Sequence, residues 1–220
     1  VTVCAFSVTR VAATTPPTAD QITEQTAADW VGEALYATGA VYDDTTRVQE
    51  GNYSIRFETD GGFDTWLYYP ATQDADWDLL AANSGGVSFW VYAENNNLGF
   101  QSYSPFIRLY TSEYNYFELT PDYDVLNDAR NQWQHYTVPI NGDDLWNAST
   151  FGAPDLAHIN YIEFHADTWD AGFILWFDGI SFDVSLAAPQ GLSATAGDGE
   201  VALTWDLFND PAGMFDHYAI

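Results

Sequence analysis

Aromatic and hydrogen-bonding side chains alternate with aliphatic side chains along four short segments of the 220-residue chain. The residues of the first kind are Trp66, Tyr68, Phe106, Arg108, Tyr110, Tyr114, Tyr116, Glu118, Tyr161, Glu163 and His165. In a β-strand successive side chains point to opposite faces, so we expect these residues outside and the aliphatic ones in a core. Tyr and Trp can stack on flat ligands while their polar atoms stay hydrated. Arg, Glu and His supply hydrogen bonds at a ligand's edge. The pattern therefore predicts a binding face.

Arg108 is one of five Arg residues in a chain that has no Lys, and it stands between aromatic residues in its segment. It can contact a ligand on the predicted face. Alternatively, it can form an ion pair with Glu118 or Glu163 across neighbouring strands. The sequence favours the two interpretations equally.

Eight alternating runs must position this face. They are Tyr53–Glu58, Asp64–Tyr69, Val87–Ala93, Phe106–Thr111, Tyr114–Leu119, Gln134–Ile140, Asn160–Ala166 and Phe173–Phe182. Gly, Asn, Asp and Pro separate the runs, and helical patterning is nearly absent. The pattern predicts an all-β fold, a two-sheet β-sandwich of the jelly-roll kind. The aromatic outward positions are concentrated on the second, fourth, fifth and seventh runs, whereas the other four carry a plainer mixture.

The composition restricts the partners of the chain. It has 32 acidic residues against five basic ones, a formal net charge of −27, and 47% hydrophobic residues. The hydrophobic share is sufficient for a sizeable core, while the negative charge disfavours nucleic acid and anionic membrane surfaces. No apolar run is long enough for a membrane span. The acidic, Lys-free composition favours a secreted or cell-surface protein, in a saline extracellular setting.

Composition divides the chain into three parts: an N-terminal strand and linker segment at 1–29, a sandwich at 30–185, and a partial domain at 186–220. The linker prediction rests on Ala12–Thr26, which is rich in Ala, Thr and Pro. Pro189 and Gly191–Asp206 resemble the opening of a fibronectin type III domain, with Trp205 as a core residue. This resemblance implies a truncated domain and a modular parent protein.

The sandwich resembles β-jelly-roll carbohydrate-binding modules. Four segments carry the resemblance: Val48–Phe57, Gly86–Val91, Trp133–Ile140 and Leu175–Phe182. It implies that the second, fourth, fifth and seventh strands share one sheet, and that this sheet binds a polysaccharide without catalysis. Sugar rings offer apolar faces to aromatic side chains and hydroxyl groups to polar ones. We therefore expect a monomeric module that holds a polysaccharide or oligosaccharide along Trp66, Tyr68, Arg108, Tyr110, Tyr116, Glu163 and His165.

The same resemblance implies a structural calcium ion. Asp178 matches a ligand on the last strand, and Glu50 with Asp43 or Asp44 matches the other ligands. Carboxylate and carbonyl oxygens suit Ca²⁺.

Two alternative functions stay open. A jelly-roll glycoside hydrolase or polysaccharide lyase would use Glu118 with Glu163 as paired carboxylates, or Tyr110, His165 and Arg108 as base, acid and uronate partner. The third possibility is a structural spacer module of an extracellular adhesion protein, which would bind no glycan.

Overall fold

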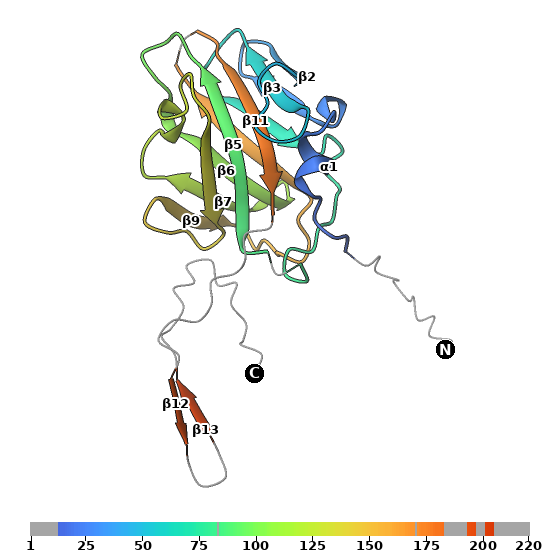
Figure 1. Ribbon diagram of the computed structural model, residues 1–220, viewed down its shortest axis with the longest axis vertical. Helices are drawn as coiled ribbons and strands as arrows, with labels where there is room; N and C mark the ends of the chain where they lie inside the picture. Colours follow the sequence, from blue (N-terminus) through green and yellow to red (C-terminus); the bar gives the residue numbers. More distant parts are fainter. Residues whose placement is uncertain (1–12, 83, 170, 183–192, 197–200, 205–220) are drawn as a thin grey trace, which may run out of the picture.

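The computed structural model describes residues 13–82, 84–169, 171–182, 193–196 and 201–204. Within this part of the chain nearly all regular structure is β-strand, and two antiparallel sheets are stacked on one another (Figure 1). The predicted all-β, two-sheet β-sandwich is confirmed.

Six strands form one sheet and five form the other. The six-stranded sheet has the order β1 (Val31–Ala34), β4 (Thr65–Tyr69), β10 (Tyr161–Asp167), β6 (Gln101–Ser112), β7 (Asn115–Pro121) and β9 (Trp146–Phe151). The five-stranded sheet has the order β2 (Gly39–Asp44), β3 (Ser54–Thr59), β11 (Ile174–Ser181), β5 (Gly86–Glu94) and β8 (Gln134–Pro139). In Figure 1, β5 and β11 lie in front of β6 and β7.

Each of the eight predicted runs lies on a strand, and β4, β6, β7 and β10 share the six-stranded sheet as the jelly-roll pattern implies. The sequence reading missed β1, β2 and β9. These strands lie at sheet edges and are mostly half-buried or exposed, so their residues lack the regular aliphatic alternation of a strand with one buried face.

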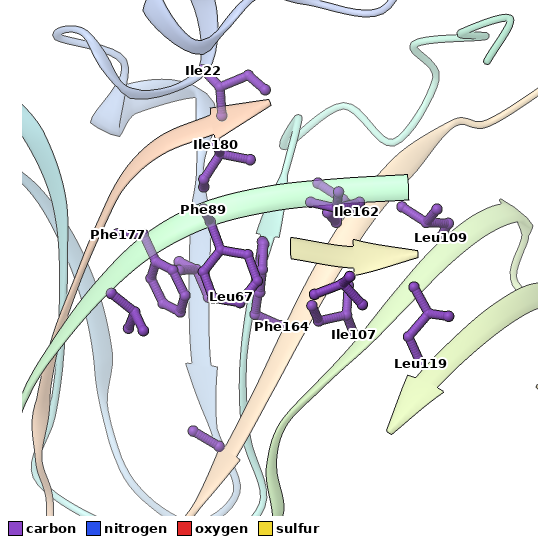
Figure 2. Close-up of a cluster of buried hydrophobic side chains, with 14 of the residues drawn as sticks. Ile22, Leu67, Phe89, Ile107, Leu109, Leu119, Ile162, Phe164, Phe177 and Ile180 are labelled. Atoms are coloured by element: carbon purple, nitrogen blue, oxygen red, sulfur yellow. The ribbon is translucent and has the colours of Figure 1, made fainter. Parts of the chain in front are cut away.

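The core lies between the sheets and follows the predicted alternation. On β5 the burial of side chains alternates along the strand, because one face packs on the opposite sheet. Phe89 of β5 and Phe177 of β11 meet Phe164 of β10, with ring centroids 4.8–5.8 Å apart. Figure 2 shows these rings together with Leu67, so the aromatic contacts join both sheets.

The segment before β1 includes the short helices α1 (Ala19–Thr23) and η1 (Ala27–Asp29). Ile22 of α1 is fully buried in the core cluster, and its carbonyl oxygen accepts a hydrogen bond from Trp30 Nε1 at 3.0 Å. Within the stretch that composition assigns to a linker, α1 packs against β11. Composition pointed to a linker, whereas one well-placed apolar side chain anchors the segment.

At the C-terminal end β12 (Ser193–Ala196) and β13 (Val201–Thr204) form an antiparallel pair. The remaining residues that resemble a fibronectin type III domain, including Trp205, lie outside the described residues, so that assignment stays a prediction. No helix in the described part of the chain is long and apolar enough to cross a membrane.

Candidate functional site

The outward side of the six-stranded sheet collects all seven residues of the predicted binding face. Strand register places Tyr68, Glu163 and Arg108 in one row across β4, β10 and β6, and the row continues to Glu118 on β7. A second row holds Trp66 and His165, and a third holds Tyr110 and Tyr116. The parity predicted from sequence is confirmed, because the alternating neighbours Leu67, Ile107, Leu109, Phe117, Leu119, Ile162 and Phe164 are buried in the core.

Glu163 is the centre of a hydrogen-bond network on this face. Its Oε1 atom accepts a hydrogen bond from the Tyr110 hydroxyl at 3.0 Å and lies 2.5 Å from His165 Nε2. The three residues are only 7–8% exposed. Because an ionised carboxylate has no proton to give, His165 Nε2 donates in this pair. The network holds these side chains in place before any ligand arrives.

Arg108 forms the ion pairs that the sequence left as an alternative to ligand contact. Its Nε donates to Glu118 Oε2 at 2.7 Å, and its Nη1 lies 3.9 Å from Glu163 Oε1. Burial opposes the positive charge, but the bond to Glu118 raises the pKa of Arg108 above its ordinary value. The guanidinium also lies 4.7 Å from the Tyr116 ring centroid and 4.9 Å from that of Phe106. The side chain is therefore charged, paired and held between rings.

Stacked rings connect neighbouring strands across this face. Phe106 lies parallel to the His165 ring at 4.1 Å, and Tyr110 lies parallel to Tyr161 at 4.3 Å. Burial raises the pKa of the Tyr110 and Tyr161 hydroxyls, and the Glu163 carboxylate adds to both shifts. Both hydroxyls are therefore protonated at neutral pH and can serve as hydrogen-bond donors.

The face has a buried base and a more exposed rim. Tyr110, Tyr161, Glu163 and His165 form the base, each less than a tenth exposed. Trp66, Tyr68, Phe106, Arg108, Tyr116 and Glu118 are half-buried above and around it. The exposed area of the face therefore belongs mainly to the rim, and Tyr110, Glu163 and His165 lie beneath it.

Two further residues extend the face beyond the predicted set. Glu33 of β1 pairs in register with Trp66, and Phe151 of β9 pairs with Tyr116. The Phe151 and Tyr116 rings are parallel with centroids 5.2 Å apart. The sequence reading missed both positions because it missed their strands. The sequence signal for β9 is the alternation in which Asn147, Ser149 and Phe151 occupy every second position.

The opposite face of the sandwich also carries aromatic residues: Trp90 and Tyr92, which belong to the plainer mixture expected there, and Trp176. On the outward side of β11 Trp176 is only 4% exposed. The Arg47 guanidinium covers it, with its carbon 4.5 Å from the Trp176 ring centroid and 4.1 Å from that of Tyr92. Arg47 also forms an ion pair with Glu94. The loop before β3 therefore covers part of this second face.

The predicted calcium ligands separate into two pairs. Asp178 is fully buried, and its carboxylate accepts hydrogen bonds from the backbone N–H groups of Gln49, Glu50 and Gly179 at 2.7–2.9 Å. Burial raises the pKa of Asp178, and Glu24 adds to the shift. The Glu50 carboxyl group lies beside Gly179, the residue after Asp178. Its carbon is 2.9 Å from the position that a Cβ on Gly179 would take.

Asp43 and Asp44 serve other purposes in the structure. Asp43 Oδ1 accepts a hydrogen bond from the Ala27 backbone at 2.9 Å. Partial burial opposes ionisation of Asp44, but hydrogen bonds led by those of Thr46 and Trp176 lower its pKa from 3.8 to about 2. Across the described residues no group of three or more His, Cys, Asp or Glu side chains is arranged to hold a metal ion.

Comparison with known proteins shows likeness in structure. No protein-family model matches the chain, and no curated protein matches its sequence. The chain is similar to the family 11 carbohydrate-binding module of a cellulosomal cellulase of Clostridium thermocellum, with 16% identity, coverage of 73% of this chain and 90% of that chain, and a TM-score of 0.45. A family 11 module from Clostridium thermocellum in complex with a β-1,3-1,4-mixed-linked tetrasaccharide has 15% identity and a TM-score of 0.44. The match covers 73% of this chain and 91% of that chain. An exo-β-agarase has 12% identity and a TM-score of 0.48, and the match covers 71% of this chain and 24% of that chain.

Proposed function

We propose that the outward face of the six-stranded sheet binds a polysaccharide chain and that this module breaks no bond. The observation that carries the proposal is the continuous surface of half-buried rings around a hydrogen-bonded base. Trp66 and Tyr68 of β4 and Tyr116 of β7 supply stacking surface for the apolar faces of sugar rings. Because Glu163 fixes the base internally, little side-chain entropy is lost when a ligand binds.

The charges on this face favour a neutral glycan. Arg108 is the one Arg on the outward side of the six described strands, and Glu118 and Glu163 already pair with it. Glu33 adds a further exposed carboxylate. A uronate or sulfate would therefore meet no unpaired cation, whereas neutral hydroxyl groups can donate to the carboxylates. The chain's net charge of −27 acts in the same direction.

Replacing Trp66 or Tyr68 by Ala should weaken glycan binding by about two- to tenfold each, because each loses a stacking contact of about 0.5–1.5 kcal/mol. Isothermal titration against neutral and anionic polysaccharides, chosen from a glycan-array screen, measures the effect. The matched control is Trp90→Ala, since Trp90 is half-buried on the opposite face, where its Nε1 donates to Glu50. Normal binding by both β4 variants, with loss in the control, would place the site on the five-stranded sheet.

A lyase is the second candidate, and one observation favours it. Arg108 Nη1 donates to the Tyr110 hydroxyl at 3.3 Å, and that hydroxyl and His165 both bond to Glu163. The residues named for base, acid and uronate partner are thus neighbours. The raised pKa of Tyr110 disfavours its use as a phenolate base, so binding is the better supported function. Release of unsaturated sugars from a uronate polymer, followed by ultraviolet absorbance, would reverse that order.

Calcium at Asp178 stays a proposal from the sequence resemblance. The oxygen ligands suit Ca²⁺ in kind, but in the described arrangement three backbone N–H groups occupy the Asp178 carboxylate. If Ca²⁺ binds the folded chain there, EDTA should lower the melting temperature and excess Ca²⁺ should restore it. Asp178→Asn should lose this response, while Asp43→Asn should keep it. A melting temperature that neither EDTA nor Ca²⁺ changes would leave Asp178 as the anchor of the loop before β3.

We also propose that the module belongs to a secreted polysaccharide-degrading or cell-surface protein and acts as a monomer. The acidic, Lys-free composition supports this setting. A spacer module would share the fold but show no affinity in the glycan screen.

A further inference from the structure

We propose that Phe63 and Trp169 form an additional sugar-binding position, which continues the candidate face beyond the ends of β4 and β10. The inference rests on the proposed function, since it assigns a further contact to the same polysaccharide chain. The ligand would be one neutral pyranose ring of that chain, stacked on the exposed aromatic pair.

The pair is unusual for its exposure. Phe63 is 38% exposed and Trp169 57% exposed, with ring centroids 5.5 Å apart. In every other ring pair of the described residues, at least one of the two rings is buried or half-buried. Contact between aromatic side chains and water is unfavourable, and a ligand that covers the two rings would remove it.

The two loops that carry the rings are fastened to each other. The Thr168 backbone N–H donates to the Gly62 carbonyl oxygen at 2.8 Å, and Gly61 and Ala171 form a β-bridge. Thr168 is only 3% exposed, and a Cβ on Gly62 would collide with its hydroxyl oxygen at 1.6 Å. Gly62 is therefore required for this close approach. These contacts connect the two described segments that carry the rings.

Backbone conformation also indicates a constrained site. Trp169 has φ of 69° and Asp64, next to Phe63, has φ of 51°. Both lie in the left-handed region, which Asp tolerates but a bulky Trp rarely adopts, at a cost for Trp169 of order 1–3 kcal/mol. The Asp167 carboxylate accepts a hydrogen bond from the Trp169 backbone N–H at 2.9 Å and helps to hold this conformation.

The position is continuous with the candidate face. His165 and Trp66 are partners in the register of β10 and β4, and that register ends one residue further on, at Ala166 and Thr65. Phe63 lies three residues before Trp66, at most about 10 Å away along the chain. A glycan that covers Trp66 therefore has the residues of the aromatic pair close to the end of the same two strands.

Polar groups beside the pair fit hydroxyl groups and not anions. Asp167 Oδ2 accepts a hydrogen bond from the Ser102 hydroxyl at 3.1 Å, and Asp64 is exposed next to Phe63. Carboxylates accept hydrogen bonds from sugar hydroxyls and repel sulfate or uronate groups. The neighbouring polar chemistry therefore selects the same neutral ligand as the main face.

The experiment compares affinity for graded lengths of neutral cello-, xylo- and manno-oligosaccharides by isothermal titration. Wild type, Trp169→Ala, Phe63→Ala and Trp66→Ala are measured, with Tyr42→Ala as a control at an exposed aromatic residue on β2 of the five-stranded sheet. We expect Trp169→Ala to weaken binding of long oligosaccharides by about two- to tenfold and to leave short ones unaffected. The melting temperature should stay unchanged, and Tyr42→Ala should bind like wild type.

The outcomes separate this inference from the proposed function. If Trp66→Ala loses affinity while Trp169→Ala and Phe63→Ala bind every length like wild type, the additional position does not exist and the face remains. If wild type binds none of the glycans in the array or the series, the proposed function fails first. If Trp169→Ala converts a dimer to a monomer in sedimentation and glycan affinity does not change, the pair contacts a second copy of the chain and the inference is overturned.

Discussion

Replacing Glu163 by Ala is expected to lower the free energy of unfolding by about 2–4 kcal/mol. The carboxylate accepts hydrogen bonds from the Tyr110 hydroxyl and His165 Nε2, and all three side chains are buried. The substitution leaves two buried donors without this acceptor, and Arg108 loses one of its two counter-charges. Chemical denaturation followed by Trp fluorescence measures the loss.

The matched control is Glu118→Ala, which removes the other carboxylate paired with Arg108. Glu118 bonds Arg108 at 2.7 Å, but its side chain is 26% exposed, so the loss should be about 0–1 kcal/mol. Glu163→Gln keeps an acceptor oxygen and should fall between the two. Equal losses for Glu163→Ala and Glu118→Ala would show that the network around Glu163 does not hold the face together.

Phe89→Ala should destabilise the sandwich by about 3–5 kcal/mol, because it removes a large side chain from a closely packed core. Phe89 is fully buried and contacts Tyr136 in its own sheet and Phe164 in the opposite sheet. Few neighbours can move into the cavity without separating the sheets. The midpoint of a urea unfolding transition should fall, with its slope unchanged.

Phe151→Ala is the control for this experiment, because Phe151 is 52% exposed at the edge strand β9. Its removal should change the free energy of unfolding by about 0.5 kcal/mol or less. A similar loss for both variants would mean that the contact between the sheets contributes little to stability.

The strands of the sandwich could be predicted because their signal is local. Alternation with a period of two residues places Leu67, Ile107 and Phe164 on the buried side of their strands, and their burial confirms it. Edge strands such as β9 carry few buried side chains, so the same signal is weak there and they were missed. Ile22 shows the converse case, where one residue of a polar segment joins the core.

The candidate face was predicted as a set of residues, but their roles were not. Parity states that Tyr110, Glu163 and His165 share a face with Trp66. It does not state how deeply each lies, because depth depends on the neighbours that the register brings alongside. Likewise, no local pattern shows that the Arg47 guanidinium covers Trp176 on the opposite face.

The sequence by itself therefore determined the all-β class, most strands and the side of each that faces water, since these follow from patterns within a few residues. The tertiary structure alone decided that Glu163 accepts from Tyr110 and His165, and that Arg108 is already paired. It also brought Phe63 and Trp169 together from two distant loops. The physical reason is that hydrogen bonds and ring contacts depend on distance in space, and chain folding sets that distance.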